Sequence, residues 1–184
     1  QLISVKSNNR DMKGLIQSWQ RTKAKGLDDY KKVMALRGNT SNSTVFADNN
    51  GNIAYWHGNY VPKRDTKFNW SKVVDGSTTA TEWQGLHNAT ETVQVINPAT
   101  GWIQNCNSTP YTVSGEASPK KKDYPVYMAP DGENGRGITA VALLSKIDKI
   151  NLDELIALGY NKKLSAFDIL LPRFIEDAKT ATLA

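Results

Sequence analysis

The chain has 184 residues, of which 39% are hydrophobic and 22% charged, so it can bury the core of one domain and is not broadly disordered. Its single cysteine, Cys106, excludes an internal disulfide and a multi-cysteine zinc site. The net charge is +5, but the only dense basic run, Lys120–Lys122, lies in a stretch without periodicity, so we expect no nucleic-acid partner. Apolar runs fall well short of the roughly 20 residues that cross a bilayer, so we expect no membrane span.

The first forty residues predict helical structure over residues 10–37. Met12, Leu15, Ile16 and Trp19 recur at helical spacing, and the pattern resumes after a break at Gly26.

Residues 43–58 predict a β-hairpin, because apolar and polar residues alternate on both sides of Asn50–Gly51. An Asn-Gly pair favours a type I′ turn, in which both central residues have positive φ.

The hydrophobic periodicity weakens over residues 59–89, which we interpret as a long surface loop. Residues 92–105 predict a second hairpin with a five-residue connection at Asn97–Gly101. The Pro-, Lys- and Gly-rich stretch 110–135 is expected to be irregular.

Helices are predicted again over residues 136–182. Asn151 and Glu154 have the spacing of a capping box, and Ser165 with Asp168 suits the start of a further helix, which Pro172 would kink or begin.

Chemical motifs in the sequence are sparse. No G-x-S-x-G elbow presents a serine nucleophile, His57 and His87 favour structural roles, and a lone Cys106 without a family signature does not establish a thiol nucleophile. Gly135–Ala140 fits the pattern G-x-G-x-x-A, but no convincing buried strand leads into it. The polar segment Gln104–Pro110 leaves two readings open: its asparagines either stabilise a developing oxyanion or turn a loop.

At these residues the sequence resembles the penicillin acylase (penicillin amidase) family of N-terminal nucleophile hydrolases, within the catalytic β-subunit. The resemblance runs from about residue 15 to residue 178. The motifs that carry it occur in the family's order at Phe46–Asp48, Gly51–Tyr55, Pro62–Arg64, Trp83–Gly85, Asn97–Ile103, Asn105–Asn107, and Arg136 with Leu143–Leu144.

The resemblance implies an α+β fold that forms part of a four-layer αββα sandwich. It also implies an amino-terminal Ser, freed by self-cleavage, that attacks an amide carbonyl and forms an acyl-enzyme. Asn107 aligns with the family's oxyanion-hole asparagine, and Arg136 with an arginine that orders the active-site network. N-acyl compounds such as penicillins and acyl-homoserine lactones are the implied small-molecule substrates, and a periplasmic or secreted location is common in the family.

Gln1 is not a nucleophile, and the family's spacing places the catalytic Ser upstream of it, so we expect residues 1–184 to be a single interior segment that is inactive alone. Its expected partners are the remaining α- and β-subunit segments of the same precursor. No cofactor is expected; calcium belongs, if anywhere, to the complete enzyme, and no metal ligand is assigned here. The alternative function is a non-catalytic scaffold or binding module with the same fold.

Overall fold

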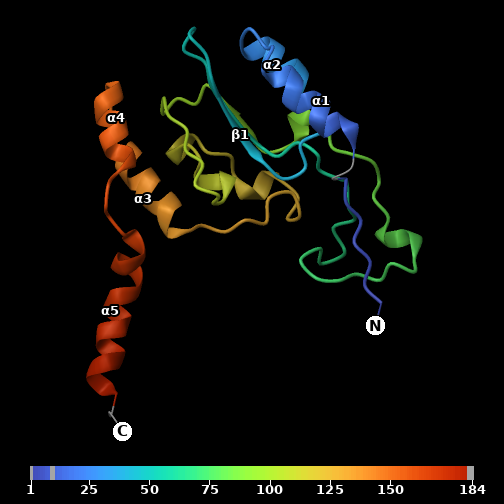
Figure 1. The fold of residues 1–184 in the computed structure, drawn as a ribbon. Helices are drawn as coiled ribbons and strands as arrows, with labels where there is room; N and C mark the ends of the chain where they lie inside the picture. The colour runs from blue at the N-terminus through green and yellow to red at the C-terminus, as the bar shows by residue number, and fades with distance from the viewer. Residues whose placement is uncertain (1, 9–10, 182–184) are drawn as a thin grey trace.

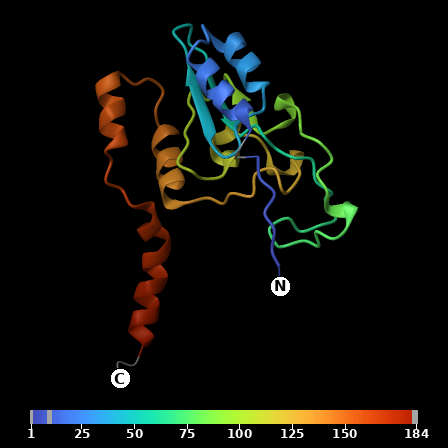
Figure 2. The ribbon, with the colours of Figure 1, turned by 45° about the vertical axis from the view of Figure 1, so that its right-hand side comes forward.

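A computed structural model describes residues 2–8 and 11–181 of the chain. It has an α+β fold in which two N-terminal helices lie against a small antiparallel sheet and three C-terminal helices follow a long irregular region. Figures 1 and 2 show the three C-terminal helices on one side of the sheet, with the last of them extending away from it. No helix of the described residues is long and apolar enough to cross a membrane.

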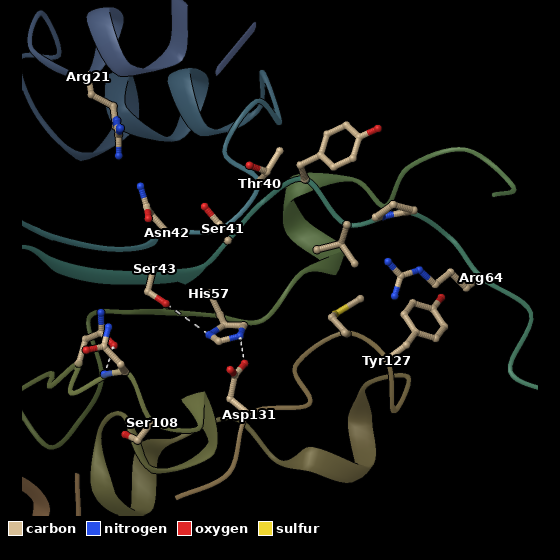
Figure 3. A pocket seen from close by; sticks show the side chains of 17 residues that line it. Arg21, Thr40, Ser41, Asn42, Ser43, His57, Arg64, Ser108, Tyr127 and Asp131 are labelled. Atoms are coloured by element: carbon tan, nitrogen blue, oxygen red, sulfur yellow. Dashed lines mark hydrogen bonds and ion pairs between the residues drawn. The ribbon is translucent and has the colours of Figure 1, made fainter. Parts of the chain in front are cut away.

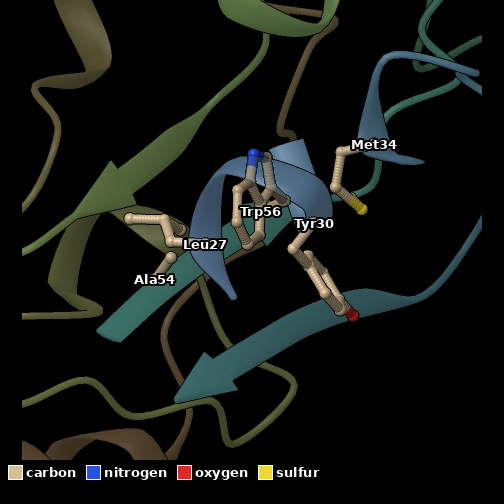
Figure 4. Close-up of a cluster of buried hydrophobic side chains, with 5 residues drawn as sticks. All are labelled: Leu27, Tyr30, Met34, Ala54 and Trp56. Atoms are coloured by element: carbon tan, nitrogen blue, oxygen red, sulfur yellow. The ribbon is translucent and has the colours of Figure 1, made fainter. Parts of the chain in front are cut away.

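The N-terminal helices are α1 (Met12–Arg21) and α2 (Leu27–Met34), both within the range predicted to be helical. The Asp11 side chain caps α1 by accepting a hydrogen bond from the Lys13 amide at 2.8 Å. Helix α2 buries one face against the sheet, where the Tyr30 ring contacts the rings of Phe46 and Trp56 at centroid distances of 4.6 and 5.6 Å. Figure 4 shows Leu27, Tyr30 and Met34 of α2 beside Ala54 and Trp56 of the sheet. This cluster is the main hydrophobic core of the N-terminal half.

Strands β1 (Ser43–Ala47) and β2 (Ile53–His57) form the first hairpin over the predicted residues. The turn is not type I′, because Gly51 has a φ of 82° whereas Asn50 does not have positive φ. The Asp48 side chain accepts hydrogen bonds from the Asn50 and Asn52 amides, at 2.9 and 3.0 Å. These bonds stabilise a longer loop that needs a left-handed residue only at its glycine.

The second predicted hairpin, over residues 92–105, is wrong. Only β3 (Gln94–Ile96) forms there, and it pairs antiparallel with β2, giving the sheet order β1-β2-β3. Asn97 explains the departure, since its amide donates to the Ile53 carbonyl at 2.9 Å and its side chain accepts from the Ile53 amide at 3.0 Å. The chain then leaves the sheet, and the Gln104 amide bonds the Val113 carbonyl instead of β3.

The chain between the strands and before the C-terminal helices is irregular, but a β-bridge and a buried cluster hold it in place. An isolated antiparallel bridge joins Pro62 to Leu86, and Val93, Met128 and Ala129 form a small buried cluster. Five 3₁₀ turns occur in these regions: η1 (Thr79–Thr81), η2 (Ala89–Glu91), η3 (Pro110–Thr112), η4 (Gly115–Ala117) and η5 (Lys121–Asp123).

The C-terminal helices are α3 (Gly135–Leu144), α4 (Leu152–Gly159) and α5 (Ser165–Thr180). The Asn151 and Glu154 side chains form a capping box at the start of α4. Pro172 lies inside α5, so it does not mark the first turn of that helix. Helices α3 and α5 contact one another near the start of α5, where the Thr139 hydroxyl donates to the Ser165 hydroxyl at 2.7 Å.

Candidate functional site

The segment that leaves the sheet at residues 104–108 makes a tight turn centred on Asn107. Asn107 has a φ of 54°, a left-handed conformation that asparagine adopts more readily than most residues. Its amide donates to the Asn105 side chain at 3.2 Å, and its carbonyl accepts from the Asn134 Nδ2 at 3.2 Å. Asn134 also donates to the Cys106 carbonyl, at 3.1 Å. The turn is therefore fixed both from within and by the residue that precedes α3.

Asn134 and Arg136 connect this turn to the start of α3. The Asn134 side chain caps the helix by accepting from the Gly137 amide at 2.9 Å, and Arg136 Nη2 donates to Asn107 Oδ1 at 3.1 Å. A guanidinium can only donate hydrogen bonds, so it must meet the oxygen of the Asn107 amide. The two N–H groups of Asn107 Nδ2 then point away from Arg136, and within the described chain Nδ2 makes no hydrogen bond.

Helix α3 can approach the turn because position 137 is glycine. A Cβ at Gly137 would overlap the Glu133 Oε1 and would lie 2.6 Å from the Ser108 Oγ and 3.0 Å from the Ser108 Cβ, which is closer than van der Waals contact allows. The glycine therefore sets the distance over which Arg136 reaches Asn107.

Asn107 lines a polar cavity of about 610 Å³, within the range of roughly 300–1,000 Å³ typical of small-molecule sites. The cavity lies between the end of β2, the loop after Gly58 and the irregular segment around Asp131 (Figure 3). The cavity is also lined by side chains that can donate or accept protons or hydrogen bonds, among them Arg21, Ser43, His57, Arg64, Ser108, Tyr127 and Asp131.

His57 lies at the centre of a hydrogen-bonded group in this cavity. Its Nε2 is 2.9 Å from Asp131 Oδ2, and its Nδ1 is 2.8 Å from the Tyr55 hydroxyl and 3.4 Å from the Ser43 hydroxyl. Asp131 favours the tautomer with a proton on Nε2, so Nδ1 accepts from a hydroxyl. Burial lowers the pKa of His57, against the opposing effect of the Asp131 carboxylate, so the imidazole is neutral at pH 7. Burial also raises the pKa of Tyr55 to about 12.

The structure brings the two site residues identified by resemblance, Asn107 and Arg136, into direct contact. Cys106 does not line the polar cavity; it lines a separate, more apolar one between α3 and the start of α5. His87 also lies outside the polar cavity, with ring nitrogens 3.1 Å from Glu91 Oε2 and 3.0 Å from the Tyr127 hydroxyl. Neither His57 nor His87 is hydrogen-bonded to this thiol.

Sequence reasoning missed most of the polar cavity. Arg64 ends the motif Pro62–Arg64, to which no role was assigned, and the structural role predicted for His57 did not include Asp131 as its partner. Asp131 lies in a stretch that has no periodicity and is 74 positions from His57, so no local pattern links the two. The one available signal was the pair of cations, Lys63 and Arg64, that follows Pro62 in an otherwise weakly patterned region.

The described residues contain no group of three His, Cys, Asp or Glu side chains placed to hold a metal ion. The side-chain oxygens of Asp48 are used by the amides of its own turn.

Comparisons with known proteins agree with the resemblance. The model of the penicillin amidase family matches residues 3–184. The penicillin G acylase of Escherichia coli is 30% identical over 118 residues, which cover 64% of this chain and 12% of that protein. Among solved structures, a thermostable penicillin G acylase from Alcaligenes faecalis matches with a TM-score of 0.62 at 20% identity, over 80% of this chain and 25% of that one.

The α+β fold and the family match together define the class of the chain: it belongs to the penicillin amidase family. It spans about an eighth of the curated relative and a quarter of the solved chain that it resembles.

Proposed function

We propose that this chain is a segment of the catalytic subunit of an amide-hydrolysing acylase, in which Asn107 stabilises the oxyanion and Arg136 orders Asn107. The observation that carries the proposal is the hydrogen bond of 3.1 Å from Arg136 Nη2 to Asn107 Oδ1. That bond leaves the donor end of the amide unpaired within the described chain, beside a cavity of small-molecule size.

In the proposed reaction, an amino-terminal Ser contributed by another part of the precursor attacks the carbonyl of an N-acyl substrate. The α-amine of that Ser takes the hydroxyl proton and passes it to the substrate nitrogen, so that the C–N bond breaks and the product amine leaves an acyl ester on the Ser. Water, deprotonated by the same α-amine, then hydrolyses the ester and frees the acid and the Ser hydroxyl. Negative charge develops on the carbonyl oxygen in both halves of the reaction. A neutral amide donor held by its own backbone and by Arg136 stabilises this charge without having to reorient during the reaction.

The assembled enzyme is proposed to be the four-layer αββα sandwich, with the remaining α- and β-subunit segments as partners. Large apolar side chains exposed on α4 and α5, including Leu155, Phe167, Leu170 and Phe174, support this proposal. Soluble proteins rarely leave such contiguous apolar surface open. Penicillins and acyl-homoserine lactones are candidate substrates, and an exported location is the candidate compartment; both rest on the family alone.

The test is to replace Asn107 in the complete enzyme. We expect Asn107→Ala to lower kcat by about 100- to 1,000-fold, which is the usual cost of losing one oxyanion donor. Because alanine also disfavours the left-handed backbone at this position, Asn107→Gly is the informative companion, since it removes the amide but accepts the same φ. The measurement is steady-state hydrolysis of a chromogenic N-acyl amide, together with thermal unfolding of each variant.

Asn49→Ala is the matched control, because Asn49 is an exposed asparagine in the turn of the first hairpin and lies outside the polar cavity. An Asn107→Gly enzyme with the kcat of the parent would contradict the role of Asn107. A complete precursor without a Gly-Ser or Gly-Cys processing site would instead favour the non-catalytic scaffold.

A further inference from the structure

The polar cavity brings together a hydroxyl, an imidazole and a carboxylate. Ser43 begins β1 and His57 ends β2, and the two are directly opposed in the strand register, so their side chains lie on one face of the hairpin. Ser43 Oγ is 3.4 Å from His57 Nδ1, and His57 Nε2 is 2.9 Å from Asp131 Oδ2. Figure 3 shows both contacts, which join the three side chains through the His57 ring. In hydrolases, these groups in this order let a base activate a serine while a carboxylate orients the base.

Asp131 is held in place by contacts on both sides of it in the chain. Met128 and Ala129 belong to a buried cluster, and the Gly132 carbonyl accepts from the Thr109 amide at 2.9 Å. The ionised carboxylate can only accept, so it holds the imidazole in the tautomer with a proton on Nε2. The lone pair of Nδ1 is therefore directed to the hydroxyl side, where it can take a proton.

Tyr55 competes with Ser43 for Nδ1 but cannot replace it as a nucleophile. Its hydroxyl is nearer to Nδ1, at 2.8 Å, yet its side chain is buried and does not line the cavity. Burial also raises the pKa of Tyr55 to about 12, so the phenol keeps its proton. The same hydroxyl donates to Ser43 Oγ at 3.1 Å, and in that arrangement the Ser43 proton is the one that meets Nδ1. Ser43 is half-buried and lines the cavity, so it is the hydroxyl that a bound molecule can reach.

We propose that Ser43, His57 and Asp131 form a second hydrolytic centre, with Ser43 as its nucleophile and small carboxylic esters as its substrates. The proposal does not rest on the proposed function, because that function places its nucleophile outside this chain. Esters are the matching class, since an alcohol leaves a tetrahedral intermediate more readily than an amine does. Asn107 lines the same cavity, and its unpaired N–H groups are donors of the kind that an oxyanion needs.

In this reaction, Ser43 Oγ attacks the carbonyl carbon of the ester while its proton moves to His57 Nδ1. The C–O bond to the alcohol then breaks, and the imidazolium gives its proton to the departing oxygen, so the alcohol leaves an acyl ester on Ser43. Water, deprotonated by Nδ1, attacks that ester, and the proton returns to Ser43 Oγ as the acid departs. Asp131 stays ionised throughout, and it acts as a positioning residue that also stabilises the imidazolium.

The experiment maps which serine of the complete enzyme reacts. The enzyme is treated with diisopropyl fluorophosphate, and the modified residues are located by fragmentation mass spectrometry. We expect phosphorylation of Ser43 besides any at the amino-terminal Ser. His57→Gln should slow the modification of Ser43 by about 100- to 10,000-fold, the usual contribution of a general base. Asp131→Asn should slow it as well, and Asp131→Glu should restore part of the rate, because a carboxylate again holds the tautomer.

The ester arm of the experiment tests turnover. After treatment with 4-nitrophenyl acetate and an acid quench, we expect an acetyl group on Ser43. The group should disappear when the enzyme is moved to buffer without the ester before the quench. An acetyl group that stays on Ser43 would overturn the hydrolytic role.

Ser41 supplies the matched control. It also lines the cavity, but within the described chain it is not hydrogen-bonded to His57. Ser41→Ala should leave the modification rate of Ser43 unchanged. If His57→Gln fails to fold, the parent enzyme still gives the answer, because a hydroxyl activated by a base should react at least about 100-fold faster than Ser41.

The outcomes also separate this centre from the proposed function. The proposal is overturned if Ser43 of the parent enzyme stays unmodified, if it reacts no faster than Ser41, or if a folded His57→Gln enzyme reacts at the parental rate. Failure of the proposed function would appear differently. N-acyl amides would then not be hydrolysed and the amino-terminal Ser would stay unmodified, while Ser43 would still react in a manner that depends on His57.

Discussion

Asn107 combines two requirements that few side chains satisfy together. Its backbone is left-handed, with a φ of 54°, and its side chain accepts from Arg136 while keeping two N–H groups available. Glycine would meet the first requirement and glutamine the second, but neither would meet both with the same reach. Asparagine suits position 107 because it tolerates the left-handed backbone and because its side chain can accept from Arg136 and still donate two hydrogen bonds.

His57 gives a pH-dependent prediction at the scale of one residue. Its pKa is lowered by burial, and the carboxylate of Asp131 opposes that shift. We therefore expect its ring to titrate below the usual value of about 6.5, and Asp131→Asn to lower the pKa further, because the carboxylate stabilises the imidazolium. The measurement is an NMR titration of the ring protons, assigned with His57→Gln.

The sign of the stability effect follows from the direction of this shift. Because the folded pKa lies below the unfolded pKa, the unfolded state binds the proton more tightly. The contribution of a neutral His57 to stability is therefore present above about pH 6.5 and is lost as the pH falls through the lower folded value. A folded pKa above 6.5, or one unmoved by Asp131→Asn, would contradict the assigned environment.

At the scale of elements, the contact between α3 and the turn at Asn107 depends on Gly137. A Cβ at this position would overlap the Glu133 and Ser108 side chains. The Glu133 carboxylate can rotate away, but the Ser108 Cβ cannot, so we expect Gly137→Ala to move the helix and the turn apart. We expect a loss of about 1–3 kcal/mol in the free energy of unfolding, as for other overpacked sites. We also expect a lower kcat in the complete enzyme, because the bond between Arg136 and Asn107 lengthens. Chemical denaturation and steady-state kinetics measure the two effects.

Gly159→Ala is the control for this element-scale prediction. Gly159 ends α4, and a Cβ there would meet no atom within 4 Å. Because alanine is the better helix former, this variant should be as stable as the parent or slightly more stable. If Gly137→Ala behaved like Gly159→Ala, the helix would not be held at the distance described.

At the scale of the whole molecule, the exposed apolar face of α5 dominates the expected solution behaviour. Phe167, Leu170, Leu171 and Phe174 follow helical spacing, and each exposes between 42 and 69% of its surface. We expect the isolated chain to self-associate through this face. Replacing Phe167, Leu170 and Phe174 with Glu, Lys and Gln should shift it toward the monomer without lowering its stability, because these side chains contribute little burial.

Sedimentation velocity over a range of concentrations measures this association. The matched control replaces Lys162, Asp168 and Lys179, polar residues in or beside the same helix, with alanine. A monomeric parent chain at high concentration would contradict the expectation. So would an equal shift toward the monomer in the control.

Local sequence patterns determined where most elements form. Helical spacing located α1 to α5, the cap at Asn151 follows from side-chain spacing, and alternation located β1 and β2. These features depend on residues a few positions apart, so they can be read without the fold. The family resemblance identified Asn107 and Arg136 as site residues, but it did not predict the hydrogen bond between them, and nothing in their spacing of 29 positions does so either.

Only the tertiary structure decided how the elements pair and what the polar cavity contains. The free edge of β2 took β3 as its partner, and Asn97 tied the following turn to that strand, so the segment after it could not return as a second hairpin. The same folding brought Asp131 to His57 and left Arg64 facing the cavity without an acid in the described chain. Such contacts join residues far apart in sequence, and their energy comes from burial and pairing that no short pattern encodes.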